Sequence, residues 1–274
     1  MIKAAGSLLV GVFGDDWHKR KLVINLLRRR VEAKFRGSVI GTAWVVILPL
    51  AMLAVYTLVF EHFLKVRWPG AVAGSGVETA LRIYLGLLVL NFFAENLSVA
   101  PQLILEHQQF VKKIVFPLPV LAYVAVLASL LPYLLGFAVA LVLLLFSSVS
   151  APASLHLVPV VVLTLLFWGL AIQWWLAAVG VFVRDLGHMV GPLISLLMFL
   201  SPIFYDRSSI PAPWRDWLLL NPLTVPIESL RHIFFATGQL QEFALLLNLL
   251  IAMLLAVVGR AFFVRLQSGF ADVI

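Results

Sequence analysis

Histidines and acidic residues are the side chains of this sequence that could catalyse a reaction or bind a metal, and they are sparse. The patterns H-E-x-x-H and G-x-S-x-G, which would indicate a zinc site or a serine nucleophile, are absent. The chain has no cysteine, which excludes disulfides, thiolate ligands and a cysteine nucleophile. The six histidines are scattered over predicted loops and span ends, at positions 18, 62, 107, 156, 188 and 232. We therefore predict no catalytic residue and no metal site.

A loop that binds nucleotide phosphates is also missing from the sequence. No segment has the form G-x-x-x-x-G-K-[ST], in which backbone amides and a lysine cradle the phosphates. We therefore expect no bound nucleotide and no other cofactor in this chain.

Glu95 is the one clear candidate for a charge inside a predicted membrane span. A carboxylate near the bilayer centre costs roughly 2.5–3.5 kcal/mol, so its side chain should face a polar cavity or a partner. It could line a pore or handle protons, or it could form a structural hydrogen bond to a neighbouring helix, which we favour. A proton-driven carrier usually needs more than one such residue, so the energy for any transport should come from elsewhere.

Aromatic residues are abundant near the ends of the predicted membrane spans. Their flat apolar faces suit the C–H faces of sugars, so some of them could line a path for a glycan. The alternative for each residue is that it packs against or anchors a helix. Besides Glu95, the candidates for lining such a path are Tyr56, Tyr84, Phe92, Phe199 and Tyr205.

The elements that position these residues must be membrane helices. Hydrophobic residues make up 62% of the 274 residues and charged residues only 12%, whereas a soluble domain has roughly 25% charged residues. Most of the surface must therefore face lipid or other helices. A net charge of +7 would suggest nucleic-acid binding in a soluble protein. Here Lys and Arg flank apolar segments, so we expect membrane lipids and no nucleic acid as partners.

Six apolar segments are long enough to cross a membrane, for which a helix needs about 20 residues. No charged residue occurs between Lys113 and Arg184, and two crossings with a turn at 147–154 fit that interval. We predict one all-α integral membrane domain over residues 1–274, with six transmembrane helices within 38–264. The spans are expected at 38–60, 82–105, 115–146, 155–183, 186–205 and 243–264.

Residues 18–36 predict an N-terminal amphipathic helix that lies in the membrane interface. Val23, Leu27, Val31 and Phe35 recur every four residues on one face. The basic side would lie near anionic headgroups, although a charge cluster that only orients the first span would give the same pattern. The basic residues assigned to this helix are Arg28, Arg29, Arg30, Lys34 and Arg36.

Residues 206–241, before the last span, combine many aromatic and leucine residues with four prolines. This segment is too apolar for an exposed loop and too interrupted for a span. We predict short re-entrant helices that dip into the outer leaflet. The alternative is a loop that lies flat on the membrane with its tryptophans at the headgroups.

The distribution of Lys and Arg sets the expected orientation. Of the 20 such residues, 14 fall in the N-terminal segment, the loops near 106–114 and 184–187, and the C-terminal end, and six fall on the other side. We therefore expect both termini on the cytoplasmic side. We also expect no removable signal peptide, because no small-residue cleavage pattern follows the first apolar stretch.

Three motifs follow one another in an order and spacing that covers nearly the full chain. The first runs from Phe35 to Trp44 and is followed by Pro49, and the second runs from Phe110 to Pro117. The third consists of Arg184-Asp185, Ser201-Pro202-Ile203-Phe204-Tyr205, Ile210-Pro211, Trp214 and Asn221-Pro222. Together they resemble the permease subunit of polysaccharide-exporting ABC transporters, the group that serves O-antigen, capsule and teichoic acid. The sequence departs from the usual pattern in the additional proline of Leu118-Pro119-Val120-Leu121.

The resemblance implies a homodimer of six-span subunits in the bacterial inner membrane, with two separate ATPase subunits that bind ATP and Mg. It further implies a channel along the dimer axis for a lipid-linked polysaccharide, such as the O-antigen of lipopolysaccharide or a capsule. The family's coupling element would correspond to residues 103–113. Its residues at the ATPase would be Glu106, His107, Gln108, Lys112 and Lys113.

Two other functions stay open at this point. A drug or lipid exporter of the same superfamily would have the same membrane helices. A membrane-embedded glycan or acyl transferase would need a catalytic carboxylate or histidine cluster on one membrane face, and the sequence shows no such cluster.

Overall fold

The computed structural model describes residues 19–35, 43–63, 68, 76–112, 116–145, 154–235 and 242–274. Within these ranges every regular element is helical and no strand occurs, which confirms the predicted all-α class. The principal helices are α2 (Arg20–Phe35), α3 (Trp44–Tyr56), α4 (Gly76–Val99), α5 (Gln108–Val111), α6 (Val120–Leu145), α7 (Val158–Phe182), α8 (Leu186–Leu200), α9 (Trp214–Trp217), α10 (Thr224–Phe235), α11 (Glu242–Leu266) and α12 (Phe270–Val273).

Four helical segments are long and apolar enough to cross a membrane, and they match the predicted second, third, fourth and sixth spans. They are Glu78–Gln102, Val120–Leu144, Leu155–Phe182 and Glu242–Val273. Two shorter apolar helices, Leu50–Val59 and Leu186–Leu200, fall within the predicted first and fifth spans. The second of these has 15 residues and is about 22 Å long, less than the roughly 30 Å hydrocarbon core. The chain is a membrane protein, and its count of six spans stays a prediction.

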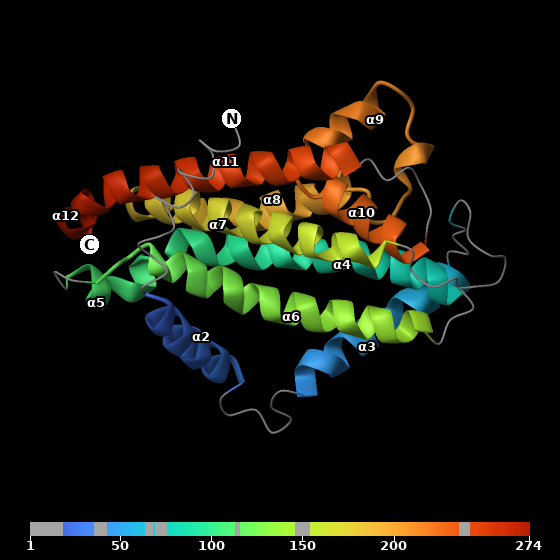
Figure 1. The fold of residues 1–274 in the computed structure, drawn as a ribbon, viewed down its shortest axis with the longest axis horizontal. Coiled ribbons are helices and arrows are strands. Elements are labelled where there is room, and N and C mark those ends of the chain that lie inside the picture. Colours follow the sequence, from blue (N-terminus) through green and yellow to red (C-terminus); the bar gives the residue numbers. More distant parts are fainter. Residues whose placement is uncertain are drawn as a thin grey trace.

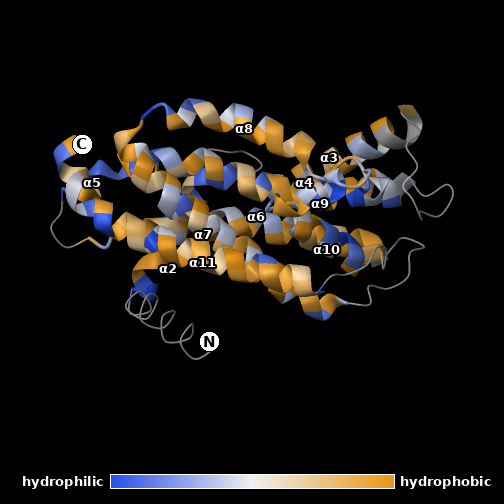
Figure 2. Ribbon diagram, turned by 90° about the horizontal axis from the view of Figure 1, so that it is seen from above, coloured by the Kyte–Doolittle hydropathy of each residue, from blue (hydrophilic) through white to orange (hydrophobic). Residues whose placement is uncertain are grey.

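Helix α4 lies at the centre of the bundle. It packs against α3, α6, α7, α8 and α10, and α7 packs along α11 in the most extensive helix–helix contact. Figure 1 shows the long helices side by side, with α5 and α12 at one end of the bundle and α9 and α10 at the other. Figure 2 shows mostly apolar residues along α11 at the surface, as expected for a helix that faces lipid.

Two glycines let helices approach closely. A Cβ atom at Gly180 in α7 would lie 2.8 Å from the Cα of Pro101, which follows α4. A Cβ at Gly259 in α11 would lie 2.7 Å from the Trp175 ring, whose Nε1 donates to the carbonyl of Leu255 at 3.1 Å. Small residues take this role in membrane helices because lipid provides no hydrophobic force for association.

Buried amide and hydroxyl groups connect the three central helices. The Asn96 amide donates to the Ser129 hydroxyl at 2.8 Å, and Gln173 Nε2 donates to Asn96 Oδ1 at 3.1 Å. These bonds join α4 to α6 and to α7. At the α7–α11 contact, Trp168 Nε1 donates to Asn248 Oδ1 at 2.9 Å. Such hydrogen bonds are worth about 0.6 kcal/mol each in membrane bundles, and they fix the register of the helices.

Helix α2 occupies most of the segment predicted to be interfacial. Val23, Leu27 and Val31 are half-buried, as their four-residue spacing predicts, and α2 packs against α6. Arg28 and Arg29 are exposed, whereas Arg30 is half-buried on the same side as Val31. Arg36 lies outside the described residues. The location of α2 in the membrane interface stays a prediction.

Candidate functional site

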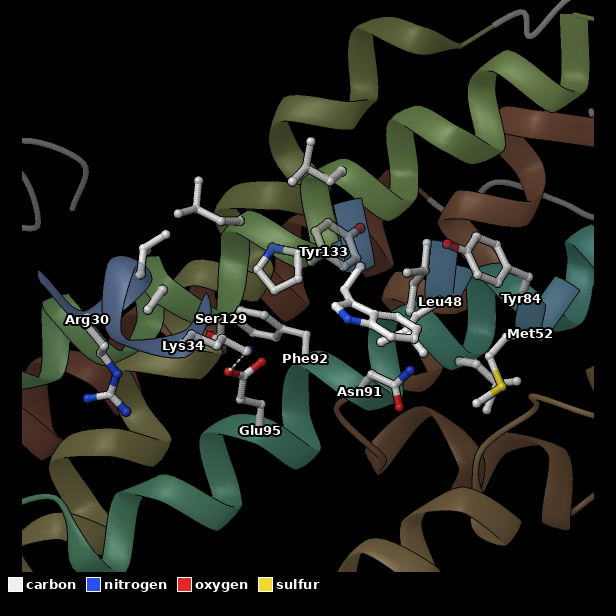
Figure 3. A pocket seen from close by; sticks show the side chains of 18 of the residues that line it. Arg30, Lys34, Leu48, Met52, Tyr84, Asn91, Phe92, Glu95, Ser129 and Tyr133 are labelled. Carbon is white, nitrogen blue, oxygen red and sulfur yellow. Dashed lines mark hydrogen bonds and ion pairs between the residues drawn. The ribbon is translucent and has the colours of Figure 1, made fainter. Parts of the chain in front are cut away.

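A cavity of about 900 Å³ lies between α2, α3, α4 and α6. Four of the six residues predicted to line a sugar path, Tyr56, Tyr84, Phe92 and Glu95, lie on its wall. Figure 3 shows the cavity with Arg30 and Lys34 of α2 at one end and Tyr84 of α4 at the other. The complete lining is Arg30, Val31, Lys34, Trp44, Leu48, Met52, Tyr56, Tyr84, Leu87, Leu88, Asn91, Phe92, Glu95, Ala128, Ser129, Leu131, Pro132, Tyr133 and Leu135.

Glu95 pairs with a lysine of the first described helix. Lys34 Nζ lies 2.9 Å from Glu95 Oε1, and the Glu95 side chain is 36% exposed. Glu95 therefore has a cationic partner on a neighbouring helix, as expected for a carboxylate inside a predicted span. It lies on α4 within the candidate span Glu78–Gln102, and its depth in the membrane stays a prediction.

The aromatic candidates fall into two groups. Tyr84 and Phe92 are buried, and the Phe92 ring packs edge-on against Tyr133 with centroids 6.1 Å apart. Phe199 lies on α8 with 68% of its surface exposed, and the Tyr205 hydroxyl donates to its carbonyl at 3.3 Å. The structure therefore separates residues that the sequence grouped together, and their role in lining a path stays a prediction.

The predicted coupling residues lie at the α5 end of the bundle (Figure 1). Glu106, Gln108 and Lys112 are exposed and His107 is half-buried, whereas Leu103 and Ile104 just before them are buried. Burial of one side anchors the segment and leaves its polar residues available to another protein. Lys113 lies outside the described residues.

His107 holds this segment in shape. Its Nδ1 lies 2.8 Å from the Leu103 carbonyl. Its ring stacks on Phe110, which stacks on Phe116 with centroids 4.2 Å apart. These contacts connect the segment to Phe116, which precedes α6.

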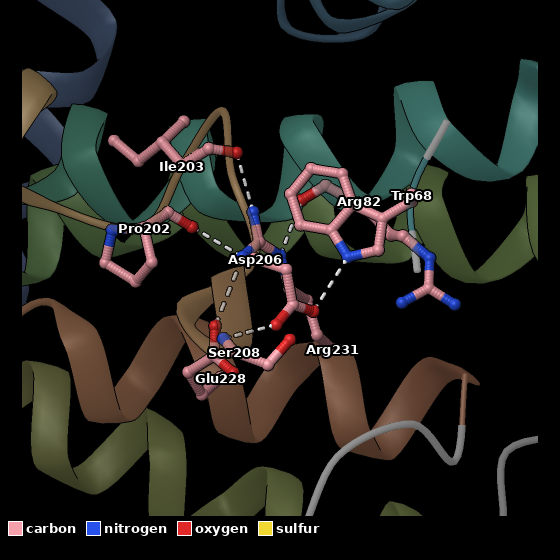
Figure 4. Close-up of polar contacts among 8 residues, drawn as sticks. All are labelled: Trp68, Arg82, Pro202, Ile203, Asp206, Ser208, Glu228 and Arg231. Carbon is pink, nitrogen blue, oxygen red and sulfur yellow. Dashed lines mark hydrogen bonds and ion pairs between the residues drawn. The ribbon is translucent and has the colours of Figure 1, made fainter. Parts of the chain in front are cut away.

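A second polar cluster, which the sequence patterns did not predict, lies near the opposite end of the bundle. Arg231 of α10 is 3% exposed. Its guanidinium donates to the carbonyls of Arg82 at 3.1 Å, Ile203 at 2.7 Å, and Pro202. It also lies 3.2 Å from Glu228 Oε1 and stacks over the ring of Trp68, as Figure 4 shows in part.

Arg82 and Arg231 are two of the six basic residues that the charge count assigns to the outer side, and both are buried; the side of the membrane on which they lie stays a prediction. Arg82 is 1% exposed and pairs with Glu78 one turn earlier in α4. The spacing of four residues between Glu78 and Arg82, and of three between Glu228 and Arg231, was the available signal, because residues so spaced share a helix face. Only the fold brings the two pairs together.

Asp206 completes the cluster from the connection between α8 and α9. Its carboxylate accepts from Trp68 Nε1 at 3.1 Å and from the Ser208 amide at 2.7 Å. Burial raises the pKa of Asp206. The hydrogen bonds from Ser208 and Trp68 and the charge of Arg231 outweigh that effect, so the pKa of Asp206 lies below its ordinary value.

The segment predicted to contain short re-entrant helices is helical in its described part. Residues 206–235 contain α9 and α10, with one short 3₁₀ turn before α9 (Arg207–Ser209) and one between the two helices (Leu218–Leu220). Helix α10 is almost entirely buried, in contact with α4, α7 and α11, whereas Trp214 and Trp217 of α9 are exposed. Residues 236–241 lie outside the described ranges. The depth of α10 in the membrane stays a prediction.

Comparison with known protein families gives the decisive match. The family model described as ABC-2 type transporter matches residues 21–235, from α2 to the end of α10. The chain belongs to the ABC-2 type transporter family. This match confirms the resemblance found in the sequence.

Among curated proteins, this ABC-2 family member is similar to O-antigen export system permease proteins named RfbA. The protein from Myxococcus xanthus is 28% identical over 229 residues, which cover 83% of this chain and 85% of the relative. One from Klebsiella pneumoniae is 24% identical over 254 residues, which cover 92% of this chain and 95% of the relative. The similarity thus extends over most of the length of this chain and of each relative.

Proposed function

We propose that this protein is the membrane-spanning subunit of an ATP-driven exporter of a surface polysaccharide, with a lipid-linked O-antigen as its substrate. The observation that supports this most is the near full-length similarity to O-antigen export permeases, together with the ABC-2 family match. Capsule is the second polysaccharide that such a subunit could export. The inner membrane is the expected location, because a lipid-linked glycan made in the cytoplasm must cross that membrane first.

A separate ATPase subunit would supply the energy. The sequence has no phosphate-binding loop, so ATP and Mg would bind to the partner. The surface residues Glu106, Gln108 and Lys112 at the α5 end provide a polar surface for that partner. Helix α12 lies at the same end as α5 (Figure 1), which fits the proposal that the C-terminal end and the 106–113 loop are both cytoplasmic.

A second copy of the chain would complete the export path. Helix α8 is mostly exposed, with Val190 its one buried residue among those described. Apart from the adjacent backbone of α8 itself, a Cβ atom added at Gly191 would have no atom of the described residues within 4 Å. Gly191 stands four residues from both Gly187 and Ser195. Small residues at this spacing allow close helix pairing in membranes. We propose that α8 meets the second copy and that Phe199 and Tyr205 line the path beside it.

Export can be tested in the source bacterium by deleting the gene and restoring it. Deletion should abolish polysaccharide at the cell surface and leave lipid-linked glycan in the cytoplasmic leaflet, and the intact gene should reverse both changes. Normal surface glycan together with increased drug sensitivity would favour a drug exporter instead. A missing or altered glycan structure without accumulation inside would favour a membrane-embedded transferase.

A further inference from the structure

The cavity between α2, α3, α4 and α6 has a size and lining that fit a small ligand. Its volume of about 900 Å³ lies within the roughly 300–1,000 Å³ of small-molecule sites. Most of its wall is formed by apolar side chains, of which the leucines are Leu48, Leu87, Leu88, Leu131 and Leu135. Such walls suit hydrocarbon better than a hydrated sugar chain, which would need polar partners along its length.

The lining positions follow the axes of the helices. On α4 they include Tyr84, Leu88, Asn91 and Glu95, which recur at intervals of three or four residues and so share one face. From Tyr84 to Glu95 the helix rises about 16 Å. The lining residues of α3 lie four apart, from Trp44 to Tyr56. The cavity is therefore an elongated groove parallel to the bundle axis, the direction in which a lipid chain lies in a bilayer.

The α2 end of the groove is basic. Arg30 is half-buried at this end and has no ion-pair partner within the described ranges. Lys34 is paired with Glu95 at 2.9 Å, so the three side chains together have one net positive charge. Figure 3 shows these side chains at one end of the cavity. Basic pockets between membrane helices near the surface are typical binding sites for phosphate-containing lipid headgroups.

One polar group on the α6 wall also lacks a partner that a ligand could supply. The Tyr133 hydroxyl is buried without a hydrogen-bond partner among the residues that the structure describes. An ester or hydroxyl oxygen of a glycerol backbone could accept a hydrogen bond from this hydroxyl, whereas a plain hydrocarbon could not.

We propose that this groove binds one anionic phospholipid from the leaflet that contains α2. The headgroup phosphate lies at Arg30 and Lys34, and an acyl chain lies between α3 and α4 toward Tyr84. The bound lipid fills the space between α3 and the rest of the bundle. This assignment does not depend on the polysaccharide proposal, because the groove would bind the lipid whatever molecule the transporter exports.

Native mass spectrometry of the purified full-length chain in mild detergent tests the proposal. Phosphatidylglycerol should bind at least about tenfold more tightly than phosphatidylcholine with the same acyl chains. Arg30→Gln should weaken phosphatidylglycerol binding about fivefold, the effect of one basic residue at an anionic headgroup. Arg29→Gln is the matched control, because Arg29 is exposed and does not line the groove, and it should change binding less than about twofold. Equal affinity for the two lipids, or equal effects of the two substitutions, would overturn the proposal.

A second pair of variants tests the groove itself without altering charge. Ala128→Trp would fill the groove from α6, whereas Ala138→Trp on the same helix changes an exposed position outside the lining. Only Ala128→Trp should abolish retention of phosphatidylglycerol. The thermal unfolding temperatures of both variants show whether each protein is folded. Retention by a folded Ala128→Trp protein would overturn the proposal.

A photoreactive phosphatidylglycerol with a diazirine on its acyl chain then locates the lipid. Cross-links should map to the groove faces of α3, α4 and α6. Cross-links confined to the outer faces of α8 and α11 would contradict the assignment. A competition experiment gives a further test. If a polyprenyl phosphate displaces bound phosphatidylglycerol at a lower concentration than phosphatidylglycerol itself needs to bind, the assignment is wrong and the groove binds a carrier lipid.

Discussion

At the scale of single residues, Arg231 connects three parts of the chain through its buried guanidinium. Its five N–H donors in a rigid fork reach carbonyls on α4 and on the segment after α8. The Pro202 and Ile203 carbonyls lie beyond the end of α8, where Ser201 has extended backbone before a proline. One side chain therefore joins three parts of the chain and replaces helix hydrogen bonds that cannot form there.

Replacing Arg231 with Met should destabilise the protein by about 3–5 kcal/mol, because several buried acceptors and Glu228 lose their partner. Thermal unfolding of the purified protein in detergent measures the change. Arg231→Lys should be intermediate, since one ammonium cannot reach all the acceptors. Arg184→Met is the control, because Arg184 is exposed and should shift the unfolding temperature little. An unchanged unfolding temperature for Arg231→Met would show that the cluster contributes nothing to stability.

Asp206 should make the stability of the cluster depend on pH. Its pKa in the folded protein lies below the ordinary value of 3.8, so its contribution is present above that value and is lost as the pH falls through the folded pKa. The unfolding temperature of Asp206→Asn should therefore be lower than that of the native protein at about pH 7, and the gap should shrink as the pH falls below 3.8. Asp216→Asn, at an exposed position, should show no such gap. A constant gap at all pH values would contradict the assignment.

At the scale of helices, α8 differs from its neighbours because it is short and mostly exposed. If α8 pairs with a second copy, Gly191→Leu should weaken the dimer about tenfold or more, because extra methylenes in a close contact cost roughly 1–3 kcal/mol. Light scattering of the detergent complex measures the change. Ala261→Leu, on an exposed position of α11, is the control. A dimer of unchanged affinity in Gly191→Leu would place the interface elsewhere.

The second prediction at the scale of helices concerns the segment that ends in α5, where we expect the ATPase to dock. Glu106→Lys should abolish export while the protein remains inserted and abundant, because docking of an ATPase needs a contact that changes between nucleotide states. Surface polysaccharide and membrane abundance are the two measurements. Glu242→Lys, an exposed acidic residue at the start of α11, should export normally. Normal export by the double variant Glu106→Lys, Lys112→Glu would show that the docking site lies elsewhere.

At the scale of the whole molecule, the polar residues at the α5 end and at the α9 end predict which end lies on which side of the membrane. The α5 end should face the cytoplasm and the α9 end should face outward. The chain contains no cysteine, so single cysteines can be introduced cleanly. An impermeant thiol reagent on intact cells should label Asp216→Cys and not Gln108→Cys. The reverse labelling pattern would invert this topology.

The sequence alone determined the class of this protein and much of its helix content. Hydrophobicity and the absence of a phosphate-binding loop are properties of continuous segments, so they predicted a helical membrane protein without its own nucleotide site. Four of the six spans and the helices α2, α9 and α10 followed from the same local patterns. The motifs near Phe35, Phe110 and Ser201-Pro202 predicted the family that the comparison then confirmed.

The tertiary structure decided which polar residues meet. Arg231 and Arg82 are 149 residues apart. The spacing of each arginine from a glutamate marks a pair within one helix, but no local pattern shows that the two pairs meet or that Arg231 reaches distant carbonyls. The position of Arg30 could not be predicted from local patterns either. Arg30 lines the same cavity as Glu95, Tyr84 and residues of α3 because of how α2 packs against α6. Helix formation depends on neighbouring residues, whereas a groove or a buried ion cluster depends on the relative placement of distant helices, which only their packing determines.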